Sequence, residues 1–419
     1  MTKLELGTYE TAAIVGAGSS GLTAIKALLR EGFKSVTCFE KRDQVGGLWN
    51  YQDQNSFNQD DFKLDLIDLN TEKTKVLPHK RRLSSDHSDD DVWKYISPVY
   101  RNLETNTPRP LMELKNHPFP EGTPLFPRKD QVLQYLIDYS KDITQHIEFN
   151  SVVVNIIELK DKKKWKVVYR RVNGLTLGGS IENPLEPDLS IEVDCVIINS
   201  GNYEVPYIPS KPGLREWQAK YPSSIVHSKY YDGPEPFGDV KGEIVVVGNS
   251  ASALDISLQV GNGLKKKVYK SSRSVTDVPG RDYKSIYVEK VGDIVEFFPE
   301  TKTITFDDGR SLSNVDSVVF GTGFLRHYPF FQEINKGDKP FITDGIRVHG
   351  LYRQIVSFYH PGLFFTMVPR YVLPFRTAEL QSSWISKVLK KKIELPDIEE
   401  MKLDELETLE KNGKGPKFH

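Results

Sequence analysis

The sequence predicts an α/β protein built from two Rossmann-like dinucleotide-binding domains, with the second domain inserted into the first. Two apolar strands, Thr11–Val15 and Glu243–Val247, each run into a glycine-bearing loop that opens a helix. The length of 419 residues is enough for two or three domains with separate cores. These three observations are the basis of the predicted fold class.

Composition excludes several classes of protein. The formal net charge is -1 and charged residues make up 27% of the chain, so nothing steers it towards nucleic acid. No apolar run approaches the roughly 20 residues of a membrane-spanning helix, and the amino terminus lacks a signal-peptide pattern. We therefore expect a soluble, cytoplasmic protein. Contact of the basic run Lys387–Lys392 with a membrane surface and assembly into a homodimer stay open.

The chain contains two cysteines. Cys38 and Cys195 lie on strands that are predicted to be buried, and neither belongs to a Cys-x-x-Cys pair. We expect both to be reduced core residues, which leaves no redox-active dithiol.

The first glycine loop is Gly16-Ala17-Gly18-Ser19-Ser20-Gly21, and helical spacing continues from Leu22 to Glu31. Gly16 allows the tight turn, Gly18 lets the backbone approach a pyrophosphate, and Gly21 lets the helix pack on the strand. The first residues of the helix offer free N–H groups to the anion.

An acidic residue follows at the expected distance. The second strand, Ser35–Phe39, ends on Glu40, which lies 19 residues past Gly21. An acidic side chain at this distance accepts hydrogen bonds from an adenosine ribose, whereas a flexible glycine turn explains neither the acid nor its spacing. Loop, helix and acid together predict a bound dinucleotide, and we include the adjacent Lys41 in its site.

Gly46-Gly47-Leu48-Trp49 follows directly. On physical grounds alone, paired glycines beside a Trp could form a packed turn. The segment also resembles the second flavin contact of the flavin-containing monooxygenases, a Gly-Gly-x-Trp run just after the ribose acid. This resemblance implies FAD at the amino-terminal site, with contacts from Gly47, Leu48 and Trp49.

Between Gln52 and Asp91 the helix and strand pattern is lost, and polar and charged residues dominate. We interpret this stretch as an insertion, mobile or loosely docked. Its basic run Lys80-Arg81-Arg82 precedes two serines and could mark a phosphorylation site, but charge runs are usually solvated surface.

Leu103-Glu104-Thr105-Asn106 is similar to the Leu-x-Thr-Asn segment of the same family. In that family the Asn side chain lies beside the flavin ring and the nicotinamide. The resemblance therefore implies that Asn106 is the catalytic residue and that Thr105 also contacts the cofactor. From the residues alone, we would expect Asn106 to bond the local backbone in a turn before Pro108.

Helix and strand patterns continue through the first domain. We expect a helix over Pro127–Ser140, a hairpin over Ile147–Arg171 with a solvent-facing lysine turn, and a strand over Ile191–Asn199. The Gly and Pro spacing from Ser200 to Pro209 predicts a linker to the second domain. The expected buried stripe of the helix is Leu133, Leu136 and Ile137.

Residues 221–231 occupy the place of the family fingerprint, Phe-x-Gly-x-x-x-His-x-x-x-Tyr. His227 and Tyr231 match it, whereas Tyr221 and Ser223 depart from it. His227 could be a general base, but a lone His beside a loop is more often structural. We assign His227 to holding the domain junction.

The second glycine loop is Gly248-Asn249-Ser250-Ala251-Ser252-Ala253, and a helix is expected through Val260. Only Gly248 guarantees backbone freedom, because Ser250 and Ala253 stand where the first loop has glycines. Ala at the last position still permits close helix packing, and Ser252 can offer a hydroxyl to the anion. A nucleotide site and a plain strand-to-helix turn both remain open for this loop alone.

The next strand, Lys267–Ser271, ends in Ser272 and Arg273 rather than in an acid. Arg273 stands 20 residues beyond Ala253, where a ribose-binding carboxylate would otherwise lie. A guanidinium pairs bidentately with a phosphate, so the site suits a 2'-phosphate and suggests NADPH. The alternative is that Arg273 simply lies on the surface.

The remaining elements lead back to the first domain. Ile294–Phe298 and Thr301–Phe306 are expected to pair, and a strand over Asp316–Phe324 ends in Gly-Thr-Gly. The family has a similar segment where the chain returns to the flavin domain, which implies that Thr322 and Gly323 contact the cofactor. Further strands are expected over Leu351–Phe358 and Leu363–Val368. A helix opening at Glu379 would then place Gln381 beside the flavin.

The resemblance covers nearly the whole chain outside residues 52–91 and identifies it as a flavin-containing monooxygenase of the short, soluble, fungal- or bacterial-like type. It implies an FAD-binding domain of residues 1–203 and 322–419, and an NADPH-binding domain of residues 204–321. The implied reaction depends on NADPH and O2 and oxygenates soft sulfur or nitrogen nucleophiles, thiols included, through a flavin hydroperoxide.

Three alternatives remain open. A Baeyer–Villiger or N-hydroxylating relative would share both nucleotide sites, although Tyr231 in place of Trp argues against the ketone oxidant. A disulfide reductase is disfavoured by the lack of paired cysteines. An NADPH-sensing flavoprotein without oxygenation is conceivable from the altered Ser223 and Ser250.

Overall fold

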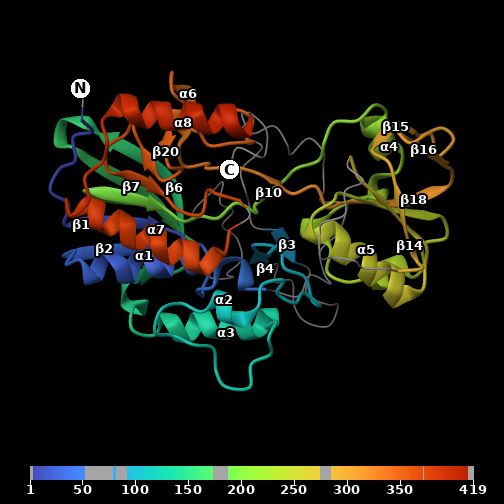
Figure 1. Ribbon diagram of the computed structural model, residues 1–419, viewed down its shortest axis with the longest axis horizontal. Coiled ribbons are helices and arrows are strands. Elements are labelled where there is room, and N and C mark those ends of the chain that lie inside the picture. Colours follow the sequence, from blue (N-terminus) through green and yellow to red (C-terminus); the bar gives the residue numbers. More distant parts are fainter. Residues whose placement is uncertain are drawn as a thin grey trace.

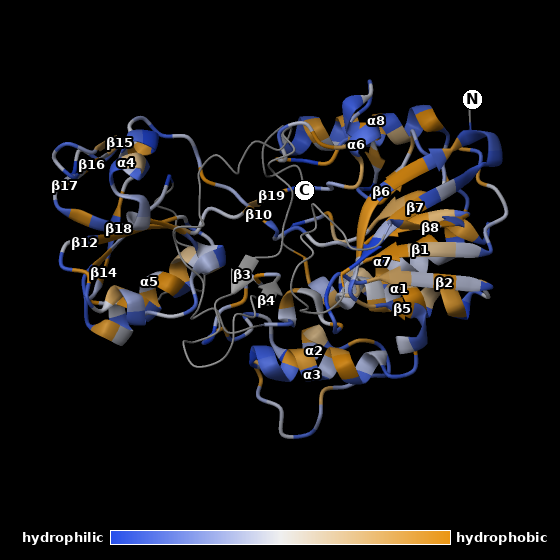
Figure 2. Cartoon of the chain, turned by 180° about the vertical axis from the view of Figure 1, so that it is seen from behind, coloured by the Kyte–Doolittle hydropathy of each residue, from blue (hydrophilic) through white to orange (hydrophobic). Residues whose placement is uncertain are grey.

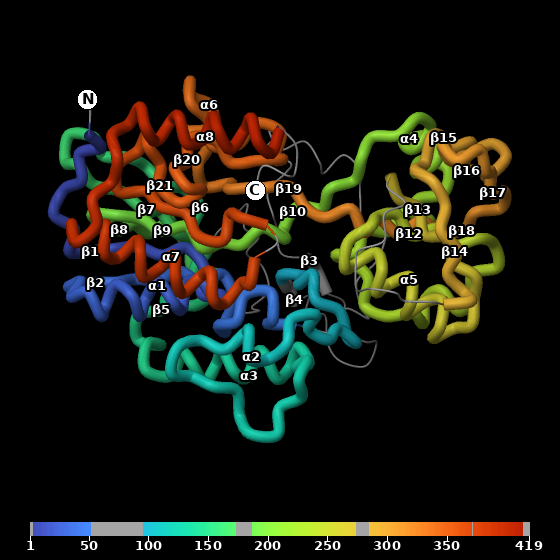
Figure 3. Tube along the Cα trace, in the orientation of Figure 1, coloured from blue at the N-terminus to red at the C-terminus, as the bar shows by residue number. Residues whose placement is uncertain are grey.

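The computed structural model describes residues 3–51, 79–81, 92–172, 187–273, 285–370 and 372–413, with the backbone alone for residues 79–81 and 92–94. The chain forms two lobes (Figure 1). Figure 3 shows that the amino-terminal and carboxy-terminal parts share one lobe, whereas the segment between them forms the other. Each lobe contains its own parallel sheet, which confirms the predicted fold class.

The sheet of the first lobe has seven strands, and five of them, β22, β9, β1, β2 and β5, run parallel to one another. Its strand order is β20-β21-β22-β9-β1-β2-β5. The bounds are β1 Thr11–Val15, β2 Ser35–Phe39, β5 Ile147–Glu148, β9 Cys195–Ile198, β20 Leu351–Tyr352, β21 Val356–Ser357 and β22 Leu363–Phe365.

Helices cover one face of this sheet, and a smaller antiparallel sheet covers the other (Figure 1). The helices of this lobe are α1 Ser19–Arg30, α2 Arg109–Met112, α3 Lys129–Ser140, α6 Gln332–Lys336, α7 Pro374–Leu389 and α8 Ile398–Asn412. The smaller sheet consists of β6 Ser151–Leu159, β7 Lys164–Arg171 and β8 Leu189–Val193. A two-stranded ladder pairs β3 His79–Arg81 with β4 Val92–Lys94.

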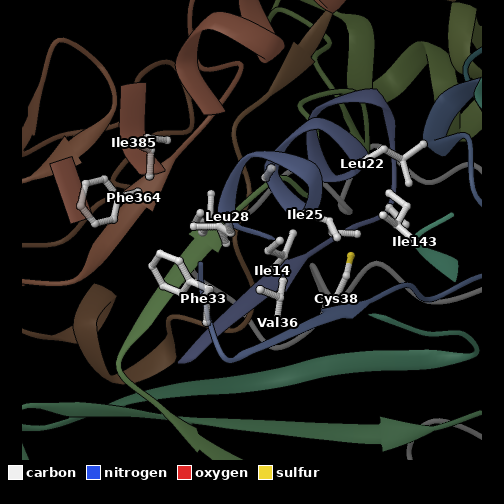
Figure 4. Packing of buried hydrophobic residues seen from close by; sticks show 14 of the residues in the cluster. Ile14, Leu22, Ile25, Leu28, Phe33, Val36, Cys38, Ile143, Phe364 and Ile385 are labelled. Carbon is white, nitrogen blue, oxygen red and sulfur yellow. The ribbon is translucent and has the colours of Figure 1, made fainter. Parts of the chain in front are cut away.

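Alternate residues of β1 enter two different cores, as the period of a strand requires. Ile14 packs under the apolar stripe of α1, which includes Leu22 and Ile25 (Figure 4). Ala13 and Val15 face the β6–β7–β8 sheet instead. Figure 2 shows that hydrophobic residues concentrate on the strands of both lobes. Burial on both faces explains why this strand is a continuous apolar run.

The second lobe repeats this plan. Its five parallel strands follow the order β11-β18-β12-β13-β14, with bounds β11 Ile225–His227, β12 Glu243–Val247, β13 Val268–Ser271, β14 Val288–Val291 and β18 Val315–Phe320. One face packs on α5 Ala251–Leu264. The other packs on α4 Leu214–Lys220 and a sheet of β15 Ile294–Phe298, β16 Thr303–Phe306 and β17 Ser311–Leu312.

Two short strands join the lobes. β10 Val205–Pro206 leads out of the first lobe, and β19 Phe324–Leu325 leads back into it. The two strands pair antiparallel, so the outgoing and returning segments lie side by side (Figure 3).

The structure corrects the strand expected over Ile191–Asn199. It contains two strands, β8 and β9, which belong to different sheets and break at Asp194. Asp194 Oδ2 accepts hydrogen bonds from the N–H groups of Glu10 at 2.9 Å and Thr11 at 2.8 Å, and from the Thr11 hydroxyl at 2.9 Å. The carboxylate therefore fixes the start of β1 while the chain turns from one sheet to the next.

The predicted stripe of α3 is also wrong in part. The helix begins at Lys129, and Leu136 is buried, but Leu133 and Ile137 are only partly buried. The buried face consists instead of Val132, Tyr135, Leu136 and Tyr139. Tyr135 turns the helix inward because its ring stacks on Phe119 at 3.9 Å.

Near the carboxy terminus, three element boundaries differ from the prediction. The strand expected over Leu351–Phe358 is the hairpin β20–β21, because Arg353 and Gln354 have positive φ of 51° and 59°. Met367, with φ 56°, lies beyond the end of β22 at Phe365. Helix α7 starts at Pro374 rather than at Glu379, since proline suits the first turn. Helix α8 was not predicted.

The hairpin expected around the lysine turn is confirmed as β6–β7. Cys38 and Cys195 are free thiols, as expected, and their burial raises the pKa of both. The insertion expected over Gln52–Asp91 lies outside the described residues except for β3. Among the described residues, no helix combines the length and apolar character needed to cross a bilayer.

We expect Asp194→Ala to lower the free energy of unfolding by about 1–3 kcal/mol, because three donors at the start of β1 lose a charged acceptor. Glu192→Ala removes an exposed carboxylate of β8 that pairs with Lys162, and should change stability by less than about 0.5 kcal/mol. Thermal unfolding of both variants checks this. Equal shifts in melting temperature would contradict a structural role for Asp194.

Candidate functional site

The first glycine loop is shaped by close backbone contacts. Gly16 has φ +99°, and a Cβ on it would lie 2.7 Å from the Asn199 carbonyl oxygen at the end of β9. A Cβ on Gly21 would lie only 1.9 Å from the Gly16 carbonyl oxygen. Both positions therefore require glycine, and α1 can begin directly at the carboxyl end of β1.

Gly18 is different, because packing does not demand a glycine there. A Cβ on Gly18 would meet only Gly47 Cα, at an ordinary 3.6 Å, and the residue has extended backbone with φ −73°. The open space beside Gly18 lies at the amino end of α1, whose first residues are Ser19 and Ser20. No described side chain caps this helix end. Open space beside free N–H groups fits a pyrophosphate.

Glu40 is buried beneath this loop. Its Oε2 accepts a hydrogen bond from Ala17 N–H at 2.8 Å, and its Oε1 accepts one from Arg42 N–H at 3.0 Å. A carboxylate offers about four acceptor positions. Capacity for the two hydroxyls of a ribose therefore remains while Glu40 also holds the loop.

The Gly46–Trp49 segment completes the same site, which we call the first cradle and which consists of residues 16–21, Glu40 and residues 46–49. Gly46 N–H donates to the Ala17 carbonyl at 3.1 Å, and Gly47–Trp49 forms a 3-10 helix. Trp49 packs against the core, and the Leu48 carbonyl accepts a hydrogen bond from the Ser97 hydroxyl. The structure thus brings the predicted residues 16–21, 40 and 47–49 together.

Two buried polar groups, one of them directly after this cradle, have no partner among the described residues. They are Asn50 Nδ2, directly after Trp49, and Thr105 Oγ1. Buried donors and acceptors are normally paired, so these atoms fit contacts to a bound group. Together with the open space at Gly18, they show that the residues present suit a dinucleotide such as FAD.

Asn106 is exposed, and its Oδ1 accepts a long hydrogen bond from the Thr107 hydroxyl at 3.5 Å. The local backbone bond that would make it a simple turn residue is not formed among the described residues. The segment around it touches both lobes. Thr105 N–H donates to the Pro127 carbonyl at 3.1 Å, whereas Tyr100 donates to Asp255 on α5.

The second glycine loop has the same form with different residues. Gly248 has φ +133°, and a Cβ on it would lie 2.5 Å from the Gly321 carbonyl oxygen. Ala253 is fully buried, and its Cβ fits because Gly321 has no side chain: a Cβ there would lie 2.8 Å away. The helix α5 begins after Ser250 without a described side-chain cap, and Ser252 lies in its first turn.

Cationic side chains lie beside this second loop. Asn249 Oδ1 accepts a hydrogen bond from the ammonium of Lys270 at 2.8 Å, and Lys270 is buried. Ser272 N–H donates to the Val291 carbonyl at 3.3 Å, and Arg273 follows with an exposed side chain. Arg273 thus stands at the end of β13, as the spacing predicted, and reaches solvent from there.

One partly buried carboxylate binds lysines from both lobes. Glu204 precedes β10, and its Oε2 lies 3.0 Å from Lys41 Nζ in the first lobe. Its Oε1 lies 3.3 Å from Nζ of Lys229 in the second lobe, and its carbonyl accepts a second bond from the same ammonium at 2.6 Å. Burial alone would raise the pKa of Glu204, but these lysines hold it well below its usual range.

His227 fastens the returning strand. Its Nε2 donates to the Gly323 carbonyl at 2.9 Å, and its Nδ1 accepts from Lys229 N–H at 3.1 Å. Complete burial lowers the pKa of His227 to about 3, so the ring is neutral at physiological pH. These contacts suit a residue that holds the junction and leave no nitrogen for proton transfer.

The last predicted contacts lie at this junction and on α7. The Thr322 hydroxyl donates to the Tyr207 carbonyl, and Gly323 also accepts from Tyr207 N–H at 2.9 Å. Gln381 is buried on α7, where its Oε1 accepts from Met367 N–H at 2.9 Å. Thr322, Gly323 and Gln381 therefore stabilise the chain where it returns to the first lobe. None of the three lies in the glycine turns of the first cradle.

Sequence reasoning missed several residues of the site. Lys229 lies within the fingerprint, and Asn50 follows the Gly-Gly-x-Trp run, so both could have been noticed. Glu204 gave no signal, since a single acid in a Gly- and Pro-rich stretch looks like solvated linker.

Comparisons with known proteins agree with this geometry. The family model "Flavin-binding monooxygenase-like" matches residues 10–64, 85–291 and 287–417. The chain is 31% identical over 413 residues to the flavin-containing monooxygenase FMO GS-OX-like 4 of Arabidopsis thaliana, covering 95% of this chain and 79% of that protein. It is 28% identical over 446 residues to the flavin-containing monooxygenase ustF2 of Aspergillus flavus, covering 97% and 87%.

A solved structure is similar over almost the whole chain. It is the S-allyl-L-cysteine S-oxygenase of Allium sativum, with a TM-score of 0.72 and 28% identity. The match covers 99% of this chain and 85% of that one. Sequence and structure comparisons therefore span both lobes.

We expect Glu204→Gln to lower the free energy of unfolding by about 1–3 kcal/mol, because the buried ammonium of Lys229 loses its charged partner. The double variant with Lys229→Met should recover part of this loss. Glu300→Gln breaks an exposed pair with Lys220 and should cost less than about 0.5 kcal/mol. Chemical denaturation measures all three, and strict additivity in the double variant would refute the pairing.

Proposed function

We propose, from the premise that the chain belongs to the flavin-binding monooxygenase-like family, that it uses NADPH and O2 to oxygenate soft nucleophiles, sulfur compounds above all. Proteins of this family use FAD and NADPH, and the chain is an FAD-dependent oxidoreductase of the monooxygenase class. What remains to be tested is which nucleotide reduces it and what it oxygenates.

One observation carries the proposal: a single chain contains two dinucleotide cradles whose strands end in opposite charges. Glu40 lies at the first and suits the two hydroxyls of a ribose, while Arg273 lies at the second and suits a 2'-phosphate. We assign FAD to residues 1–203 and 322–419, and NADPH to residues 204–321. The division of the sheets between the lobes supports this assignment.

The chemistry comes from the cofactor. FAD, when bound, accepts a hydride from NADPH and passes two electrons to O2, so that one oxygen atom enters the nucleophile and the other leaves as water. The chain would hold the phosphates at the uncapped helix ends and exclude water between the lobes. Asn106, on a segment fastened to both lobes, would offer its amide to the groups that meet there.

Sulfur is the preferred nucleophile in this proposal. The S-oxygenase from Allium sativum acts on a sulfur compound, and its fold matches 99% of this chain. The fingerprint ends in Tyr231 rather than Trp, which disfavours ketone oxidation.

The direct test is NADPH-dependent oxygenation of a thioether, a thiol, an amine and a cyclic ketone under ¹⁸O₂. We expect one labelled oxygen atom in the sulfur product. A labelled ester from the ketone, or peroxide as the sole product with every compound, would contradict the proposal.

We expect Asn106→Ser to keep FAD and to lower product formation about tenfold or more, because the amide at the meeting point of the two lobes is lost. Asn102→Ser, an exposed residue of the same segment, is the matched control. Product yield per NADPH consumed measures the effect. Equal yields from the two variants would remove Asn106 from the mechanism.

We expect Arg273→Ala to raise the KM for NADPH about 10- to 100-fold and that for NADH far less, since a charge-assisted bond to the 2'-phosphate is lost. Lys267→Ala removes an exposed cation just before the same strand and controls for net charge. Steady-state kinetics with NADPH and with NADH measures both KM values. An equal effect of Arg273→Ala on both nucleotides would refute the assignment.

A further inference from the structure

Arg326 is a buried cation that the proposed function does not use. It directly follows β19, and its side chain is 1% exposed. Its Nη2 donates to the Val368 carbonyl, while Nε and Nη1 are buried and have no partner among the described residues. Three N–H bonds of a buried guanidinium therefore lack an acceptor, which native proteins rarely tolerate.

A second guanidinium lies close to the first. Arg370 Nη2 donates to the Phe324 carbonyl of β19 at 3.3 Å, and its side chain is partly exposed. Burial lowers the pKa of Arg326, and the like charge of Arg370 lowers it further. The phenols of Tyr328 and Tyr203 act in the opposite direction on the pKa of Arg326. Among the described residues, no carboxylate lies within ion-pair distance of either guanidinium.

Two guanidiniums without a carboxylate are stable together when an anion joins them. Leaving a buried charge unpaired is strongly destabilising. A carboxylate removes this cost, because its two oxygens match the planar fork of an arginine. The arrangement is therefore suited to a ligand that brings its own carboxylate.

The position of the pair connects it to the reaction. Arg326 lies on the returning segment and bonds Val368, whereas Arg370 bonds the Phe324 carbonyl of the returning segment, which leads from the second lobe back to the first. Val368 lies just after β22. Thr366, the first residue after β22, accepts a hydrogen bond through its hydroxyl from the Asn199 side-chain amide, and the Asn199 carbonyl lies next to Gly16. The pair thus lies at the same carboxyl edge of the sheet as the first cradle.

We propose that Arg370 and Arg326 form a carboxylate-binding site for the substrate, so that the enzyme selects anionic sulfur compounds over neutral ones. Arg370, which solvent reaches, receives the carboxylate, and the buried Arg326 completes the cationic site. This inference rests on the proposed oxygenation of sulfur and adds to it the class of substrate.

The test compares two thioethers that differ in charge, 4-(methylthio)benzoate and its methyl ester, with the full-length, FAD-loaded protein. We expect kcat/KM for the acid to exceed that for the ester at least tenfold, mainly through KM. Arg370→Ala and Arg326→Met should reduce this ratio at least tenfold, and Arg370→Lys should restore it only in part because the fork is lost. Arg376→Ala, an exposed arginine on α7, is the control and should leave the ratio unchanged.

A second measurement does not depend on turnover. Equilibrium dialysis of benzoate should show binding to the wild-type protein and to Arg376→Ala, and at least tenfold weaker binding to Arg370→Ala. If neither thioether is oxygenated, the proposed function fails, while benzoate binding still tests the carboxylate site.

Three results would overturn the inference. The first is equal kcat/KM for acid and ester in the wild-type protein, and the second is benzoate binding that survives Arg370→Ala. The third is a loss of FAD or a raised KM for NADPH in both arginine variants with an unchanged acid-to-ester ratio, because the pair would then serve a nucleotide. Circular dichroism and flavin content of each variant separate these results from misfolding.

Discussion

The close contact of backbone on backbone at the glycine turns is the constraint on which the rest of this structure depends. The helix α1 can begin over the end of β1 only because Gly21 presents no side chain 1.9 Å from the Gly16 carbonyl. In the second lobe the corresponding helix residue is Ala253, and its side chain fits because Gly321, directly after β18, has none. In both lobes the helix end after the glycine turn has no described side-chain cap, which suits the binding of a phosphate.

The junction between the lobes connects the two glycine-loop sites. Glu204 binds Lys41 and Lys229 from opposite lobes, and His227 binds the returning strand at Gly323. Lys41 is the neighbour of Glu40, so the junction is attached directly to the first cradle. In our proposal, Arg326 of the returning segment and Arg370 extend the same region towards the substrate.

The sequence was sufficient for the parts of the fold that follow from local rules. β1, β2 and β12 have the predicted bounds. For β1 and β12 the reason is that a buried parallel strand is an apolar run, here followed by a glycine turn. The break at Asp194 and the inward face of α3 could not be predicted, since they depend on partners such as Thr11 and Phe119 that are distant in the chain. The same holds for Glu204 and Arg326, because their partners Lys41, Lys229 and Val368 lie elsewhere in the chain.

The central claim is that one chain binds two nucleotides and passes electrons between them. Anaerobic titration of the purified full-length protein with FAD and then NADPH tests it most directly. The account predicts one FAD per chain and complete bleaching of the flavin absorbance by about one equivalent of NADPH. A protein that takes up no flavin, or whose bound flavin stays oxidised in the presence of NADPH, would contradict it.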